Sequence, residues 1–386
     1  MAYNIHFDTV DLPPEAKELR RAVRAFLRAE IDAGNFSPAS EKGSFSKAFA
    51  RKVGARGWIG MTWPKRYGGH ERSHLERYVV IEEMLAARAP TRSYSTADRQ
   101  SGPVILRFGQ EAVKEKILPQ IAAGELCFCI GLSEPNSGSD VFAASTRARK
   151  TEGGWLVNGR KIWTSNAHNS DYMIALLRTS PPIKDNRRHG LTQFLIDCKS
   201  PGITIRPIVN LTGAHDFNEV VFDDVFVPDL HLIGEVDMAW KQASDELAYE
   251  RSGPDRWLET LPSLTELVRA AGAEPGERIA AGIGREVAHL ATLRRMSLSV
   301  AGMLQAGKTP AVEAAVVKDL GTNWEQALPN QVRLLAPPPG DSTPPSNDDR
   351  FEEALSFTTL IAPKLTIQGG TREVLRGIIA RGLGLR

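Results

Sequence analysis

The sequence predicts an α+β protein whose helices and strands occupy separate stretches of a 386-residue chain. Apolar residues follow helical spacing at first, alternate every second residue from about Leu126, and return to helical spacing after Gly234. Such segregation favours α+β over a βαβ sheet, and the chain is longer than one compact core usually holds. We therefore expect an N-terminal helical domain (1–125), a central β domain (126–233) and a C-terminal helical bundle (234–386).

Composition and charge exclude several classes of protein. Hydrophobic residues make up 42% and charged residues 24%, which is typical of a soluble globular protein. A net charge of +2 gives no electrostatic case for binding nucleic acid or an anionic membrane. The chain has no apolar run of membrane-spanning length and no signal-peptide pattern, so we expect no membrane span. Three cysteines make no disulfide framework, which favours reduced thiols in the cytoplasm, and no His or Cys cluster indicates a metal site.

Four helices are expected in the N-terminal domain, because apolar residues recur there at helical spacing between charged ones. Gly124 follows the last of them as a stop signal. The stretch Gly57–Gly69, rich in Gly, Pro and aromatic residues, is expected to be a packed connector. The expected helices are one that opens at Pro13-Pro14, then Ser46–Gly54, Leu75–Leu85 and Gln110–Ala123.

The central domain carries several short apolar runs broken by Gly and Pro. Gly153-Gly154 and Asn158-Gly159 are turn signals, so strands are expected on either side of each pair. Strands this short and this numerous indicate a small barrel or a sandwich. The charged segment Pro181–Gly190 is expected to be a surface loop.

Helical periodicity in the last domain is clearest over Ile279–Met303 and Ala311–Leu328. The proline-rich, polar segment Leu335–Asp349 has neither helical nor strand periodicity and is expected to be a loop. No GxGxxG motif follows a predicted strand, so the sequence does not support a Rossmann dinucleotide site.

Two stretches, Cys127–Asp140 and Gly159–Asn166, have the residues that a flat ligand needs. The first ends in small residues, which let a backbone approach a ligand closely and direct N–H groups at it. The second places Trp163 ahead of two hydroxyls, Thr164 and Ser165, so that a flat indole face adjoins single hydrogen-bonding groups. Read separately, each stretch could be an ordinary strand end.

Glu250 lies on the apolar stripe of the expected helix Asp237–Arg251. At about 100° per residue, Trp240, Leu247 and Glu250 fall within about 80° of one another. Pro254 follows, and a proline clashes with the carbonyl four residues before it, which is that of Glu250. The helix should therefore kink or end at this carboxylate and aim it into a cleft, where it could act as a base. The alternative is a solvated carboxylate near a helix end.

Near the C-terminus, Gly369-Gly370-Thr371 precedes a short amphipathic helix. Thr371 is suited to be its N-cap. The free N–H groups at a helix start suit a phosphate or a developing oxyanion. A plain capped terminal helix is the alternative.

The two paired motifs and the order of the elements resemble the acyl-CoA dehydrogenase family, most strongly over Gly57–Arg256 and Leu365–Arg386. The resemblance implies a helical N-terminal domain, a central small β-barrel domain and a C-terminal four-helix bundle. It also implies FAD as cofactor and removal of two hydrogens from Cα and Cβ of an acyl-CoA thioester. The implied ligand contacts are Leu132 and Ser133 at the flavin pyrimidine edge, Trp163, Thr164 and Ser165 around the isoalloxazine ring, Ser139 where flavin meets the substrate's pantetheine arm, and Thr371 at the cofactor.

The sequence departs from the family's pattern in ways that affect the site. Gly369 stands where many members carry a glutamate, whereas Glu250-Arg251 matches the branch that carries its base on the bundle helix. Glu250 is therefore the implied base, the Gly369 backbone N–H the implied donor to the thioester carbonyl, and Arg251 a substrate contact. The family's two segments that reach the FAD of a neighbouring subunit are missing, and Leu335–Asp349 stands near the second.

The expected function is FAD-dependent α,β-dehydrogenation of an acyl-CoA to the 2-enoyl-CoA. An electron-transfer flavoprotein is the expected electron acceptor, and the expected assembly is a homotetramer or a heteromer with a related chain. Two alternatives stay open: an acyl-CoA oxidase-like enzyme, and a non-catalytic or half-site subunit of a heteromeric acyl-CoA dehydrogenase.

Overall fold

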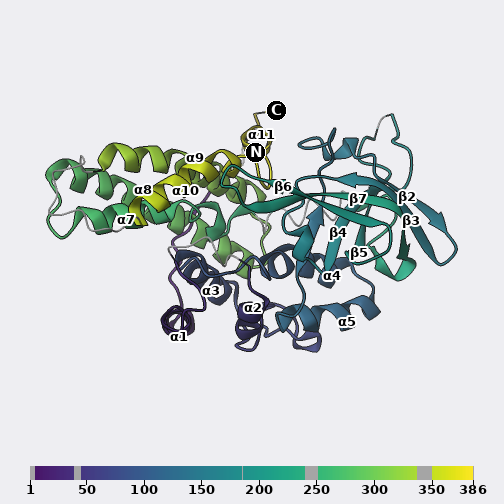
Figure 1. Cartoon of the computed structure of the whole chain (residues 1–386), viewed down its shortest axis with the longest axis horizontal. Coiled ribbons are helices and arrows are strands. Elements are labelled where there is room, and N and C mark those ends of the chain that lie inside the picture. Colours follow the sequence, from purple (N-terminus) through teal and green to yellow (C-terminus); the bar gives the residue numbers. More distant parts are fainter. Residues whose placement is uncertain (1–4, 39–44, 185, 240–250, 337–349, 386) are drawn as a thin grey trace. The chain divides into compact units, whose positions relative to one another are not determined.

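The computed structural model describes residues 5–38, 45–184, 186–239, 251–336 and 350–385. Helices, then a sheet, then helices follow one another along the chain, which confirms the predicted fold class (Figure 1). Contacts divide the chain into two compact units, here called the helical unit (residues 1–42, 74–89 and 251–386) and the sheet unit (residues 43–73 and 90–250). The division into three domains at residues 125 and 233 remains a prediction.

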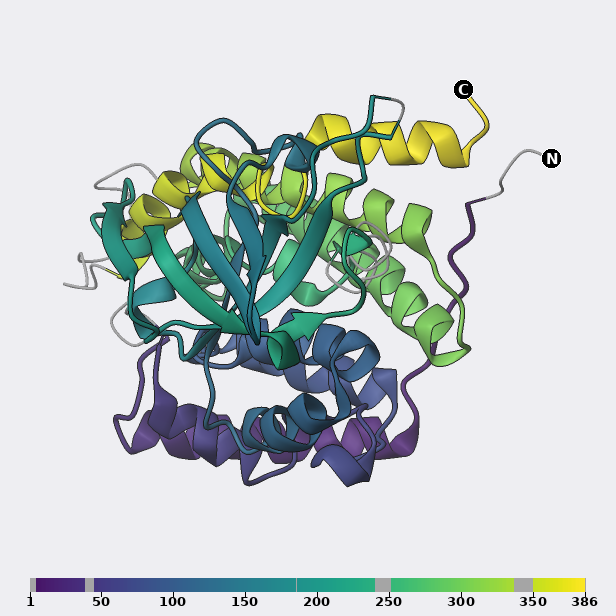
Figure 2. The same cartoon turned by 90° about the vertical axis from the view of Figure 1, so that its right-hand side faces the viewer.

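One mixed sheet forms the centre of the sheet unit. Its strands are ordered β6-β7-β3-β2-β4-β5-β8, and β1 pairs in parallel with β4. Figure 2 looks onto these strands, which cross one another with a strong twist. The strands are β1 (Phe128–Gly131), β2 (Arg147–Thr151), β3 (Gly154–Lys161), β4 (Tyr172–Arg178), β5 (Leu191–Asp197), β6 (Ile203–Val209), β7 (His215–Pro228) and β8 (Leu232–Ile233).

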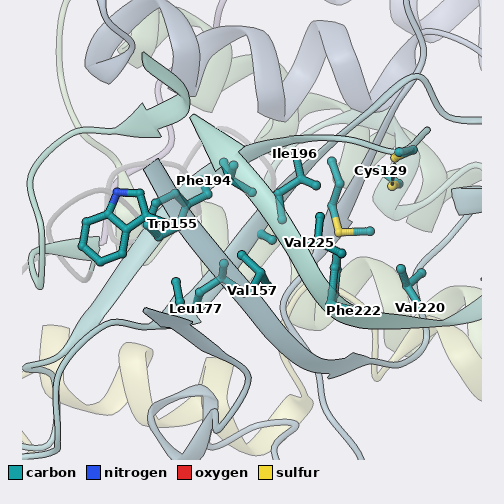
Figure 3. Packing of buried hydrophobic residues seen from close by; sticks show 14 of the residues in the cluster. Cys129, Trp155, Val157, Leu177, Phe194, Ile196, Val220, Phe222 and Val225 are labelled. Carbon is teal, nitrogen blue, oxygen red and sulfur yellow. Dashed lines mark hydrogen bonds between the residues drawn. The ribbon is translucent and has the colours of Figure 1, made fainter. Parts of the chain in front are cut away.

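A continuous apolar core lies along the inner face of this sheet (Figure 3). Trp155 and Phe194 pack edge to face with ring centroids 5.4 Å apart. Val157, Leu177 and Ile196 are at most 1% exposed and close around them. Alternate residues are buried along β7, as the two-residue periodicity predicted, whereas β4 and β5 are buried over consecutive residues.

Of the two predicted turns, the first is confirmed and the second is wrong. Gly153, with φ +69°, makes the turn between β2 and β3. At Asn158-Gly159, however, β3 continues, and its pairing with β7 shifts register between Val157 and Gly159. Gly159 has φ +134°, and a Cβ there would lie 2.8 Å from the Thr146 Cα. The glycine therefore marks a β-bulge beside a close backbone approach, which gives the same sequence signal as a turn.

Short helices complete the sheet unit, and the predicted ones are confirmed. Ser46 caps α2 by accepting from the Phe49 N–H at 3.1 Å. Gly124, with φ +72°, follows α5. Periodicity missed the π-helical turn Ala97–Ser101 and α4, since each is too short to show a helical repeat. The helices are α2 (Lys47–Gly54), η1 (Lys65–Tyr67), η2 (Ala97–Ser101), α4 (Gly102–Phe108), α5 (Glu111–Ala122), η3 (Val141–Ala143), η4 (Ala167–Asn169) and η5 (Asp229–His231).

Long helices build the helical unit, and four of them, α7 to α10, pack on one another. Glu82 of α3 links three helices, because its carboxylate forms ion pairs with Arg20 of α1 and Arg294 of α8, each with an N–O distance of 2.6 Å. Leu264, Leu293 and Leu328 lie in the core. The helices are α1 (Pro14–Asp32), α3 (His74–Ala86), η6 (Pro254–Arg256), α7 (Leu261–Ala271), α8 (Glu277–Gln305), α9 (Ala311–Leu335), α10 (Arg350–Leu365) and α11 (Arg372–Gly382).

Two sequence predictions fall on parts of the chain outside the described residues. They are the helix Asp237–Arg251 over its residues 240–250, and the loop Leu335–Asp349 over its residues 337–349. Among the helices that are described, none has both the length and the apolar character needed to cross a membrane.

Candidate functional site

The structure brings the two sequence motifs together within the sheet unit. The segment that follows β1 runs beside the end of β3, where the Ile162 N–H donates to the Ser133 carbonyl at 2.9 Å. One residue earlier on β3, Lys161 donates through Nζ to the Leu132 carbonyl at 3.2 Å. Leu132 and Ser133 are thereby held next to the segment that carries Trp163.

A buried ion pair lies beneath this junction. Lys161 Nζ is 2.7 Å from Glu134 Oε1, and the two side chains are 0% and 4% exposed. Glu134 also accepts from the Ser145 N–H and hydroxyl and from the Thr146 N–H. Burial acts to raise the pKa of Glu134, but the Lys161 charge and these donors lower it to about 2. Burial also lowers the pKa of Lys161, and the Glu134 charge opposes that shift. Glu134 is therefore an anion held by donors on every side.

Trp163 presents its indole to the outside of the sheet unit. The side chain is 57% exposed and meets Phe217 edge to face, with centroids 6.0 Å apart. Its backbone lies in the left-handed region at φ +58°, which is uncommon for a bulky side chain. An exposed aromatic ring held on a strained backbone is a feature of ligand sites.

Thr164 is clamped and buried next to this tryptophan. Its N–H donates to the Asn218 carbonyl at 3.1 Å, and Asn218 Nδ2 donates back to the Thr164 carbonyl at 3.0 Å. The Thr164 hydroxyl is buried and has no hydrogen-bond partner within the described part of the chain. The protein itself therefore encloses this hydroxyl. Ser165, by contrast, is exposed.

Asn218 and two histidines were missed from the sequence. His168 and His215 stack with ring centroids 3.8 Å apart, and a nitrogen of each lies within hydrogen-bond distance of Asn218 Oδ1. Burial lowers the pKa of His168, and the neighbouring His215 lowers it further. The available signal was a polar residue, Asn218, at the start of the apolar run along β7.

In the first motif, hydrogen bonds close the loop between Glu134 and Asp140, and the residues at its tip are exposed. Glu134 and Ser137 exchange two backbone hydrogen bonds of 2.7 and 3.0 Å, and the Ser137 hydroxyl donates to the Asp140 carbonyl. A Cβ added at Gly138 would meet nothing within 4 Å. Ser139 is exposed, so the tip is accessible to a ligand.

In the helical unit, the turn before α11 gathers three of the predicted residues. Gly369 and Gly370 have φ values of +67° and +106°, which favour glycine. Thr371 caps α11 as predicted, accepting from the Val374 N–H at 3.4 Å. Arg251 lies close by, since its Nη2 would be 3.6 Å from a Cβ added at Gly370. Glu250, the predicted base, lies outside the described residues.

Models of two domains of one known family match the N-terminal and central parts of the chain. The acyl-CoA dehydrogenase N-terminal domain matches residues 13–125, and the acyl-CoA dehydrogenase middle domain matches residues 129–225. Acyl-CoA dehydrogenase IpdE1 of Mycobacterium tuberculosis is 32% identical, over 96% of this chain and 98% of its own length. The chain belongs to the acyl-CoA dehydrogenase family. It is therefore a flavin-dependent oxidoreductase that uses FAD and acts on acyl-CoA thioesters.

Solved structures share the fold over nearly the whole chain. The Tcur3481-Tcur3483 steroid ACAD is 25% identical, with a TM-score of 0.82 over 97% of this chain and 99% of that one. The ChsE4-ChsE5 complex from Mycobacterium tuberculosis is also 25% identical, with a TM-score of 0.83 over 98% of this chain and 100% of that one.

The residues of the sheet unit fit the FAD of an acyl-CoA dehydrogenase. The exposed Trp163 indole can cover a ring face, and the exposed Ser165 hydroxyl can serve a ring nitrogen or oxygen. The open tip at Gly138 leaves room for a bulky group. These residues could hold the cofactor without any rearrangement of the buried ion pair.

Proposed function

We propose that this chain oxidises an acyl-CoA thioester to the 2-enoyl-CoA with FAD as the immediate electron acceptor. The observation that carries the proposal is the exposed Trp163 indole with the exposed Ser165 beside it, inside a matched acyl-CoA dehydrogenase middle domain. Bound FAD supplies the acceptor for a hydride from the substrate Cβ.

Residues of the sheet unit bind and orient the flavin. Leu132 and Ser133 contact the pyrimidine edge, and Trp163, Thr164 and Ser165 flank the ring. Ser139 adjoins both the flavin and the pantetheine arm, which its exposed position allows. Thr371 of the helical unit is a further cofactor contact; its hydroxyl can still donate while it accepts from Val374.

Glu250 and the turn before α11 carry out the proton chemistry. Glu250 removes the α-proton, and the Gly369 N–H donates to the thioester carbonyl as negative charge develops there. Arg251 binds the substrate next to this turn. The glycine φ values at Gly369 and Gly370 support the assignment, because they describe a backbone turn with no side chain over its N–H groups.

A bulky acyl group is the proposed substrate class. The Tcur3481-Tcur3483 protein is named a steroid ACAD, and its likeness covers 97% of this chain. A base on the bundle helix in place of the terminal turn leaves room beside Gly369, which is compatible with a branched or polycyclic acyl chain. An electron-transfer flavoprotein is the proposed acceptor, and the cytoplasm the proposed location.

A half-site subunit is the second candidate. Two similar solved structures carry paired names, Tcur3481-Tcur3483 and ChsE4-ChsE5, the second of which is called a complex. This chain also lacks the family's segments that reach a neighbouring subunit's FAD. In this candidate the chain binds FAD only together with a related chain.

A purification and substrate screen tests both candidates and the oxidase alternative. The chain is purified alone and co-expressed with a related chain, and the visible flavin band is measured in each. Straight-chain, branched and steroid-derived acyl-CoA thioesters are then offered with an artificial electron acceptor or with oxygen alone. Turnover of a bulky thioester only with the artificial acceptor supports the dehydrogenase. Turnover with oxygen alone supports the oxidase, and no flavin reduction by any thioester contradicts the proposal.

A further inference from the structure

The Glu134–Lys161 ion pair joins the two motifs assigned to flavin, yet neither residue touches the ligand in the proposed function. Glu134 belongs to the loop after β1, and Lys161 is the last residue of β3. Both side chains are almost inaccessible, at 4% and 0% exposure. Two buried charges are costly to keep, and apolar replacements of similar volume are often neutral. Packing alone therefore does not explain why this position holds an ion pair.

Glu134 cannot act as a base or ligand contact, because its oxygens are occupied. One oxygen receives the Ser145 N–H and hydroxyl, both at 2.8 Å. The other receives Lys161 Nζ at 2.7 Å and the Thr146 N–H at 3.0 Å. Such a carboxylate can act only through the groups that it holds, and of these Lys161 is the one that donates to Leu132.

Lys161 contacts the peptide group between Leu132 and Ser133. Its stem passes Gly131, where a Cβ would lie 3.2 Å from Lys161 Cγ, and its ammonium donates to the Leu132 carbonyl at 3.2 Å. In a trans peptide the carbonyl and the following N–H point in opposite directions. With the Leu132 carbonyl turned toward Lys161, the Ser133 N–H is turned away from it.

The Ser133 N–H is available to a ligand. Its own carbonyl is held by the Ile162 N–H at 2.9 Å, so the residue is fixed on both sides. Among the described residues, nothing accepts a hydrogen bond from the Ser133 N–H. A fixed donor of this kind is preorganised for an acceptor on the flavin.

We propose that Lys161 and Glu134 are positioning residues for FAD. Lys161 turns the Leu132–Ser133 peptide so that the Ser133 N–H donates to an oxygen of the pyrimidine edge, and Glu134 holds the ammonium in place. This inference rests on the proposed function, which assigns Leu132 and Ser133 to that edge.

The test uses a double variant, Glu134→Gln with Lys161→Met, because each single variant would leave one buried charge unpaired. FAD labelled with ¹³C at its two pyrimidine carbonyls is bound to the full chain, or to its complex if the chain requires a partner. We expect one carbonyl resonance to move toward its value in an aprotic solvent. We also expect FAD affinity to fall about tenfold, the value of one lost hydrogen bond.

A second ion pair of the same unit provides the matched control. Lys47 donates to both oxygens of Asp171, at 3.0 and 2.9 Å, and Asp171 also accepts from the Cys127 N–H, which lies on the other side of β1 from Leu132 and Ser133. Lys47→Met with Asp171→Asn should leave the carbonyl resonances and FAD affinity at wild-type values. If the Glu134/Lys161 double variant binds FAD with unshifted resonances and wild-type affinity, the pair is merely structural and the inference is overturned.

A wild-type measurement covers the case in which the double variant does not fold. In the FAD-loaded protein, the Ser133 amide should exchange its hydrogen slowly, because the cofactor accepts from it. Exchange as fast as in an unprotected peptide would overturn the inference. Trp163→Ala distinguishes a failure of the proposed flavin site from a failure of the positioning role. If this variant leaves the flavin spectrum unchanged, the proposed flavin site itself is wrong. If it alters the spectrum while the Glu134/Lys161 double variant does not, only the positioning role fails.

Discussion

Trp163 carries the first prediction at the scale of single residues. Trp163→Ala removes an exposed indole that we assign to the flavin ring, so FAD affinity should fall by about 1 kcal/mol, the size of one aromatic contact. Flavin fluorescence should change as well, because the ring loses its covering group. Fluorescence titration with FAD measures both effects. Phe226→Ala is the control, since Phe226 is 47% exposed on β7 of the same unit. Equal behaviour of the two variants would contradict the assignment.

Glu250 carries the second prediction. Glu250→Gln keeps size and polarity but removes the basic oxygen, so flavin reduction by substrate should slow on the order of 10²–10⁴-fold. FAD and acyl-CoA should still bind, as equilibrium titration can verify. Stopped-flow measurement of flavin reduction gives the rate, and a near wild-type value would exclude Glu250 as the base.

A change of base position extends this test. Combining Glu250→Gly with Gly369→Glu should restore part of the activity if both positions face one α-carbon. Gly369 has φ +67°, so a side chain there costs about 1–2 kcal/mol of stability. The melting temperature of the double variant should therefore be compared with that of Gly369→Ala, which has the same backbone strain but no carboxylate.

Acid stability is the third prediction, and it depends on Glu134. Its folded-state pKa is lowered from 4.5 to about 2, so the folded state binds the proton less well than the unfolded chain. This contribution to stability is complete above pH 4.5 and is lost as the pH falls toward about 2. Denaturant unfolding of the wild type should show a loss of stability across this window. The double variant Glu134→Gln with Lys161→Met should lack that component, and an identical pH dependence in the two proteins would contradict the pKa assignment.

At the scale of elements, the bulge in β3 brings the backbone at Gly159 close to Thr146. Gly159→Ala combines a φ of +134° with a Cβ 2.8 Å from the Thr146 Cα, and Thr146 donates to Glu134. We expect the variant to lose about 1–3 kcal/mol of stability. Gly153→Ala in the same hairpin has φ +69° but open space around the added carbon, so it should lose less. Thermal unfolding measures both variants, and equal losses would show that the contact with Thr146 does not matter.

At the scale of the whole molecule, we predict that the chain works as an oligomer, either of identical chains or with a related chain. Apolar side chains of the helical unit are exposed, among them Leu334 and Ile367 at 63% and 64%. Light scattering after size-exclusion chromatography, with and without the related chain, gives the mass. A monodisperse monomer with full FAD occupancy would contradict the prediction.

Local features of this protein could be predicted from the sequence alone. Helix and strand segments, the Ser46 and Thr371 caps and the glycine stop at Gly124 depend on residues within a few positions of one another. Their signals, periodicity and capping chemistry, are therefore contained in consecutive residues. The family resemblance has the same origin, since it depends on short motifs around Ser133 and Trp163 in a certain order.

Contacts between distant residues were decided by the tertiary structure. The Asn158-Gly159 pair has the composition of a turn, and only its pairing with β7 shows that it is a bulge. Lys161 is 27 residues from Glu134, and Thr164 is 54 residues from Asn218. Whether such groups meet depends on strand register, and a shift of one residue would turn each side chain to the other face of the sheet. The sequence by itself therefore determined the order of elements and the pair of motifs, whereas the register of β1, β3 and β7 decided which buried groups hold those motifs together.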